Sequence, residues 1–169
     1  MCSGGGKMKK LKVDLEEIAF YMENQDRYEE DYYLDKESGE VVGLLSRCIE
    51  VVEGDKEIDD LLEWEKKEVK IAEEILYTNP GRYKRIPEKP SYEEYNLMVK
   101  FAESVEDKEL KEKLAIALDG KGAFRQFKNV LSSYPEYMEK WFEFKQRRMN
   151  QEVIGWLQDI GIEPVTTAE

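Results

Sequence analysis

Residues 119–148, DGKGAFRQFKNVLSSYPEYMEKWFEFKQRR, decide the fold of the second half of this chain. Apolar side chains recur every three or four positions before and after Pro135, and this spacing predicts two amphipathic helices. Pro135 suits the first turn of the second helix, because an N–H there would have no acceptor within the helix. Gly120 and Gly122 predict a tight turn into the first helix, with Gly120 as the C-terminal cap of the helix before it. The stretch therefore predicts a helical hairpin followed by a long last helix.

The aromatic residues of this stretch have the spacing of core residues. Phe124 and Phe127 lie three positions apart on the first helix, and Trp141 and Phe142 adjoin methionines on the second. Rings at helical spacing are usually buried rather than stacked on a partner. Phe144 lies off the main stripe, and we expect it to be exposed or to meet a partner.

Further helices are expected on the N-terminal side of this stretch. Capping residues mark helix starts at Asp14 and at Ser91 (in a capping box with Glu94), and Asp107 begins the next helix. Another long helix is expected from Asp55 to Tyr77. It carries a main apolar stripe and a second one, so we expect it to be covered on two sides; the second stripe consists of Trp64, Ile71 and Ile75.

Strands are expected only in the first half of the chain. Tyr32–Asp35 and Glu40–Leu44 flank a turn that ends in Gly39, and this pattern predicts a β-hairpin. Tyr83–Ile86 is expected to join the hairpin in a small antiparallel sheet. We expect Cys48–Val52 to lengthen the second strand or to form another.

These elements predict an α+β fold that is predominantly helical. The small antiparallel sheet (the hairpin plus one strand) is expected beside a bundle of about five or six helices. A chain of 169 residues suits one domain, which we place at residues 13–164, with a long acidic helical insert at about 47–77. We expect residues 1–12 to be a disordered tail or an added cloning segment.

The composition bounds the chemistry of the protein. The chain has no histidine, so it lacks the commonest general base and excludes triads of the Ser-His-Asp and Cys-His kinds. Cys2 and Cys48 have no metal-site spacing and form no disulfide framework. We therefore expect no cofactor and no metal, and we lean toward a protein that is not an enzyme. No apolar run is long enough for a membrane span or a signal peptide, so we expect a cytoplasmic location.

Charge is divided unevenly along the chain, whose formal net charge is -12. Residues 1–81 hold 11 basic and 22 acidic residues, whereas residues 82–169 hold 15 and 16. Basic residues gather after Asp119 and just before Pro87. If they converge, they would make a surface for an anion, and the candidates are Gly120, Lys121, Gly122, Arg125, Lys128, Lys145, Arg148, Arg82 and Arg85. The alternatives stay open: the glycines form only a turn, and the basic side chains pair with the acids of this protein.

Several fragments together resemble a bacterial family. They are VDLEEIAFYME, YYLDKESGEVV, RYKRIP, DGKGAFRQFKNVL, YPEYMEKWFEFK and WLQDIGIEP, in this order. The chain resembles the uncharacterised protein family 0158, of unknown function, over about residues 13–164. The resemblance implies no activity. It implies that the N-terminal helix and hairpin belong to the same unit as the helical part.

Three functional hypotheses remain after these observations. The leading one is a non-enzymatic binding or regulatory module with a basic surface for nucleic acid, a nucleotide or a protein. The second is a protein-interaction partner that acts through its acidic N-terminal half. The third, an enzyme that uses carboxylates and a metal ion, has no ligand spacing to support it. The last helix, rich in tryptophan and methionine, could supply a homodimer face.

Overall fold

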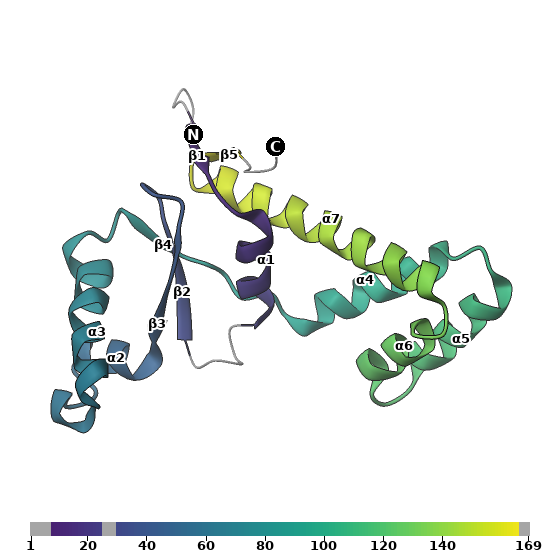
Figure 1. Cartoon of the computed structure of the whole chain (residues 1–169), viewed down its shortest axis with the longest axis horizontal. Coiled ribbons are helices and arrows are strands. Elements are labelled where there is room, and N and C mark those ends of the chain that lie inside the picture. Colours follow the sequence, from purple (N-terminus) through teal and green to yellow (C-terminus); the bar gives the residue numbers. More distant parts are fainter. Residues whose placement is uncertain (1–7, 25–29, 166–169) are drawn as a thin grey trace. The chain divides into compact units, whose positions relative to one another are not determined.

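The computed structural model describes residues 8–24 and 30–165, and it confirms a predominantly helical α+β fold (Figure 1). The chain divides into two compact units. Unit 1 comprises residues 1–88 and 152–169, and unit 2 comprises residues 89–151. The helices are thus distributed over two units. That residues 13–164 form a single domain stays a prediction.

Unit 1 contains the predicted three-stranded antiparallel sheet. Strands β2 (Glu30–Asp35), β3 (Val41–Leu45) and β4 (Tyr83–Arg85) lie in the order β3-β2-β4, and β2 pairs with both neighbours. The hairpin turn needs Gly39, whose φ of 82° is in the left-handed region and whose added Cβ would lie 2.0 Å from the Lys12 carbonyl oxygen. Helix α1 (Leu15–Asn24) begins after Asp14, whose carboxylate accepts from the Glu17 N–H at 3.1 Å, as the capping pattern predicts.

A second, parallel strand pair was not predicted. β1 (Lys9–Lys12) pairs with β5 (Ile162–Val165), with Lys9 opposite Ile162. The expectation of a tail over residues 1–12 is therefore wrong for Lys9–Lys12, while residues 1–7 lie outside the described residues. The cause is tertiary: KKLK has little strand propensity of its own, and its partner lies near the other end of the sequence.

The acidic insert at 47–77 is broken into short helical pieces. They are α2 (Ser46–Val52), the 3₁₀ turn η2 (Ile58–Asp60), α3 (Glu63–Glu73) and the π turn η3 (Glu74–Thr78). The predicted strand at Cys48–Val52 is wrong, because helix α2 buries Cys48 in a cluster with Leu61, Ala72 and Ile75. The long helix begins at Glu63 rather than at Asp55. At this start the Glu65 carboxylate accepts from the Leu62 N–H at 2.9 Å.

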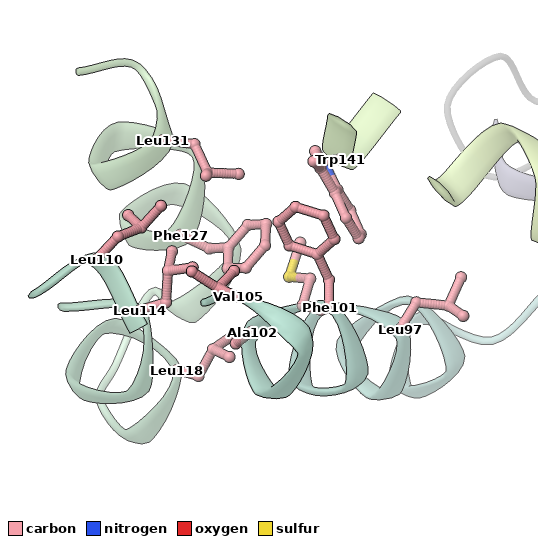
Figure 2. Packing of buried hydrophobic residues seen from close by; sticks show 11 residues of the cluster. Leu97, Phe101, Ala102, Val105, Leu110, Leu114, Leu118, Phe127, Leu131 and Trp141 are labelled. Carbon is pink, nitrogen blue, oxygen red and sulfur yellow. The ribbon is translucent and has the colours of Figure 1, made fainter. Parts of the chain in front are cut away.

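Unit 2 is built from four helices around an aromatic core (Figure 2). They are α4 (Ser91–Ser104), α5 (Lys108–Asp119), α6 (Ala123–Leu131) and α7 (Pro135–Asp159), of which α7 continues into unit 1. Trp141 meets Phe127 edge to face with ring centroids 5.0 Å apart and Phe101 at 5.5 Å. Helix α5 starts at Asp107 as predicted, and the Asp107 carboxylate caps it by accepting from the Leu110 N–H at 3.0 Å.

Three sequence expectations for the helices need correction. Phe144 is partly buried against the unit 2 core, and its ring lies tilted to that of Phe101 with the two centroids 5.7 Å apart, so it is not an exposed ring. Ser91 makes no capping hydrogen bond at the start of α4. The second stripe of α3 is not covered: Ile75 is buried, but Trp64 and Ile71 are 54% and 48% exposed. Among the described helices, none has the length and apolar character to cross a bilayer.

Candidate anion-binding surface

The turn between α5 and α6 depends on one glycine rather than two. Gly122 is the N-terminal cap of α6 and has φ 67° and ψ 34°, in the left-handed region. Its carbonyl oxygen accepts from the Gln126 N–H at 2.9 Å, which starts the helix. Gly120, with φ -110° and ψ -177°, is extended, a conformation open to any residue. The turn therefore brings Lys121 directly before the first turn of α6, where free N–H groups carry partial positive charge.

Helix α6 buries one side and exposes a side without acids. Phe127 and Leu131 are 0% exposed and anchor the helix in the unit 2 core. No acidic residue occurs between Asp119 and Glu136. Three exposed basic side chains remain; we call them the cationic face of α6, and they are Lys121, Arg125 and Lys128.

The cationic face has no counter-ion within the described residues. Arg125 and Lys128 lie three positions apart and are neighbours on the helix surface. None of the ion pairs of residues 8–24 and 30–165 includes Lys121, Arg125 or Lys128. Their positive charge is therefore available to a partner.

Polar amides and one ring accompany these charges. Gln126 and Asn129 are exposed on α6, and Asn129 lies one turn beyond Arg125. The ring of Phe124 is 36% exposed. Phe124 was predicted to be core, and the amides were not predicted as part of the site, although the i,i+4 spacing of Asn129 from Arg125 could have indicated one of them.

The other candidates of unit 2 are engaged by their own neighbours. The Lys145 ammonium donates to the Glu94 carboxylate at 2.8 Å, and both side chains are about one fifth exposed, at 22% and 21%. The Arg148 guanidinium lies over the Phe144 ring, 5.6 Å from its centroid. Glu94, which was predicted to cap α4, is thus the ion-pair partner of Lys145 instead.

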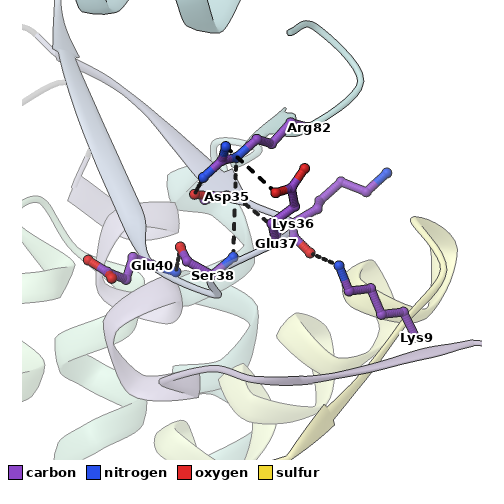
Figure 3. A network of polar contacts seen from close by, with 7 residues as sticks. All are labelled: Lys9, Asp35, Lys36, Glu37, Ser38, Glu40 and Arg82. Atoms are coloured by element: carbon purple, nitrogen blue, oxygen red, sulfur yellow. Dashed lines mark hydrogen bonds and ion pairs between the residues drawn. The ribbon is translucent and has the colours of Figure 1, made fainter.

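The two candidates of unit 1 form ion pairs with acids of the same unit. Figure 3 shows the Arg82 guanidinium turned toward Asp35 and Glu37; its Nε and Nη2 donate to the two Asp35 oxygens at 2.9 and 2.8 Å. This bidentate bond holds the pKa of Asp35 well below its ordinary value, and burial of the carboxyl opposes the shift only in part. Arg85 pairs with Asp31 at 3.2 Å.

The candidate residues therefore separate into two groups. Acids of this protein form ion pairs with Arg82, Arg85 and Lys145, and Arg148 lies over an aromatic ring. The turn glycine Gly122 and the cationic face of α6 lie together on one turn and one helix. For the carboxylate enzyme hypothesis, the described part of the chain offers no group of three or more acidic or cysteine side chains placed to hold a metal ion.

A family comparison agrees with the resemblance in the sequence. The model of an uncharacterised protein family, UPF0158, matches residues 8–169. A UPF0158 protein of Pseudomonas aeruginosa is 28% identical over 157 residues, which cover 93% of this chain and 88% of that protein. No solved structure matches significantly.

Two chlamydial relatives are much longer than this chain. A UPF0158 protein of Chlamydia pneumoniae is 31% identical over 132 residues, which cover 78% of this chain and 36% of that protein. One of Chlamydia trachomatis is 32% identical over 132 residues, with coverages of 78% and 35%. The chain thus matches about a third of the length of these relatives.

Proposed function

This chain belongs to the uncharacterised protein family UPF0158, and we propose that it is a non-enzymatic binding module that receives an anionic partner on the cationic face of α6. One observation carries the proposal. Arg125 and Lys128 are exposed on a helix without acids and Lys121 is exposed in the turn before it, and none of the three has an ion-pair partner in the described part of an acidic chain. The cytoplasmic location stays a prediction from the sequence.

The charge of unit 2 supports the choice of α6. Unit 2 holds 12 basic and 11 acidic residues, whereas unit 1 holds 14 and 27. An anionic segment on α6 therefore binds to a unit whose own charges nearly balance, although the whole chain is acidic.

The chemistry of the exposed face favours single-stranded nucleic acid among anionic partners. Arg125 and Lys128 suit phosphates, and the amides of Gln126 and Asn129 suit base edges. The partly exposed ring of Phe124 suits stacking on an unpaired base. An acidic peptide would pair with the charges but has no bases to stack on the ring.

The test is binding of labelled single-stranded RNA and DNA, duplex DNA and polyglutamate by wild type and by Arg125→Glu/Lys128→Glu. We expect the single strands to bind best, with a log–log salt slope of about -2 for three phosphate contacts. The double variant should bind roughly tenfold more weakly or worse. Lys67→Glu/Lys70→Glu is the matched control, because both side chains are exposed on α3 with the same spacing and charge change.

Two outcomes would overturn parts of this proposal. Unchanged binding in Arg125→Glu/Lys128→Glu, or an equal loss in the α3 control, would remove the cationic face of α6 as the site. If polyglutamate competes as well as RNA of equal charge, the site stands but the proposed partner becomes an acidic protein segment instead of nucleic acid.

A further inference from the structure

Unit 1 exposes apolar side chains where the acidic insert turns into α3. Ile58, Leu62 and Trp64 are 43%, 57% and 54% exposed within a span of seven positions. The one other apolar residue of this span, Leu61, is buried. An exposed tryptophan with two exposed aliphatic neighbours is unusual on a surface with no partner, because tryptophan concentrates at the centres of protein interfaces.

Acids surround these apolar side chains. Residues 53–64, which we call the acidic apolar segment, contain six acids and one lysine. All of residues 53–60 are exposed. Five of the acids form no ion pair with another described residue, and they are Glu53, Asp55, Glu57, Asp59 and Asp60. The segment thus offers unneutralised negative charge beside apolar anchors.

The base of this segment is fixed, so the surface is preformed. Leu61 is 6% exposed and packs in the cluster that contains Cys48, Ala72 and Ile75. Glu65, 2% exposed, accepts from the Leu62 N–H at 2.9 Å and pairs with Arg47 at 2.9 Å. These contacts hold Leu62 and Trp64 outward on an ordered helix start, which lowers the entropy lost when a partner binds.

We propose that the acidic apolar segment is a docking site for a basic amphipathic helix of another protein, in which lysine or arginine flanks leucine-like anchors. Charge complementarity selects this partner over a second copy, since a copy that docked with the same face would bring six acids against six. Trp64 and Leu62 supply the apolar contact, and the surrounding carboxylates set its orientation and exclude acidic helices.

The site continues along α3 for about two turns. Ile71 lies seven positions after Trp64, on the same face and about 10 Å further along the helix axis. It is 48% exposed. A partner helix that lies along α3 would therefore contact Trp64 and Ile71 in succession, with Lys67 and Glu68 between them.

Designed peptides test this docking site on the whole chain. The probes are a Lys/Leu amphipathic helix of roughly five turns, a Lys/Ser peptide of equal charge and a Glu/Leu peptide with the same apolar face. We expect only the Lys/Leu peptide to bind, with a blue shift of tryptophan emission that is absent in Trp64→Phe, because Trp141 is already buried and the partly buried Trp156 lies on α7, outside the acidic apolar segment.

The variant Leu62→Ser/Trp64→Ser should bind the Lys/Leu peptide roughly tenfold more weakly. Both side chains are more than half exposed, so the fold is spared, which circular dichroism checks. The control is Tyr92→Ser/Ile116→Ser, two exposed apolar residues of unit 2, and it should bind like wild type.

Three results would overturn the proposal. They are equal binding of the Lys/Ser peptide, unchanged binding in Leu62→Ser/Trp64→Ser, and self-association of the free protein that the same variant abolishes. The last result, measured by sedimentation, would assign the surface to a second copy. None of them depends on α6, so the proposed function is tested separately.

Discussion

Arg82 in unit 1 and Arg125 in unit 2 belong to basic clusters that look alike in the sequence but differ in the structure. Arg82 gives two hydrogen bonds to Asp35, whereas Arg125 is exposed and has no ion-pair partner in the described part of the chain. The difference follows from the acids nearby: the hairpin carries Asp35 and Glu37, whereas α6 carries none. A basic cluster is available to a partner only where the fold brings no carboxylate to it.

The largest expected effect tests whether the two units are independent. Phe127→Ala should lower the free energy of unfolding by about 3 to 5 kcal/mol, because the ring is 0% exposed in the unit 2 core. Helix α7 supplies Trp141 to this core and places Val153 and Leu157, both 0% exposed, in unit 1. We therefore expect amide protection in both units to fall together in hydrogen exchange.

The control for that experiment is a phenylalanine on the surface. Phe142→Ala, at a ring 56% exposed, should change stability by less than about 1 kcal/mol. If Phe127→Ala opens the amides of residues 89–151 while those of unit 1 keep wild-type protection, the units are separate domains.

The second effect concerns the neutralised cluster of unit 1. Asp35→Asn should lower stability at pH 7 by about 2 to 3 kcal/mol, because it removes a buried carboxylate that accepts from Arg82, Glu37 and Ser38. The folded pKa of Asp35 is below its ordinary value. Its stabilisation is therefore present above about pH 4 and is lost as the pH falls toward the lower folded pKa.

Urea unfolding of wild type and Asp35→Asn at pH 7 and at pH 3 measures this difference. The gap between the two proteins should narrow at the lower pH. Asp59→Asn serves as control, since Asp59 forms no ion pair with another described residue. A gap that stays constant with pH would mean that Asp35 does not act as a charged acceptor.

Sequence patterns predicted the elements that local chemistry determines. The hairpin, the Asp14 cap and the helix start at Asp107 follow from turn residues and carboxylates, and the structure confirms them. Helical spacing predicted the aromatic core of unit 2 correctly for Phe127 and Trp141, whereas Phe124 and Phe142, which were also predicted to be core, are exposed. Features set by distant residues were missed. Strand β1 depends on β5, which lies at the other end of the described chain.

The candidate surface shows the same division. Helical spacing placed Arg125 and Lys128 together on an outer face, and both are exposed there. Spacing could not reveal that Glu94 lies beside Lys145, because 51 positions separate them. It also could not show that Trp64 is exposed, since apolar periodicity is the same for a covered stripe and an open one.

A third effect contrasts a paired cation with an unpaired one inside unit 2. Lys145→Ala should lower the free energy of unfolding by about 1.5 kcal/mol, because it leaves the partly buried Glu94 carboxylate without its donor. This loss lies between those typical of an exposed ion pair and of a buried one. Arg125→Ala should leave stability within about 0.5 kcal/mol but weaken RNA binding. Thermal unfolding and RNA titration of both variants measure the contrast. Loss of RNA binding in Lys145→Ala with stability unchanged would reverse the assignment of the two cations.

The smallest effect separates the two glycines of the α5–α6 turn. Gly122→Ala should destabilise the protein by about 1 kcal/mol, because a Cβ is strained at φ 67° although no atom lies within 4 Å of it. Gly120→Ala should change stability by less than about 0.5 kcal/mol, because that backbone is extended and the nearest atom, the Ile116 carbonyl oxygen, is 4.0 Å away. Urea unfolding measures both, and equal losses would show that both glycines are needed. A loss confined to Gly122 would mean that the left-handed cap alone fixes how Lys121 enters the cationic face of α6, so Gly122→Ala should also weaken RNA binding while Gly120→Ala does not.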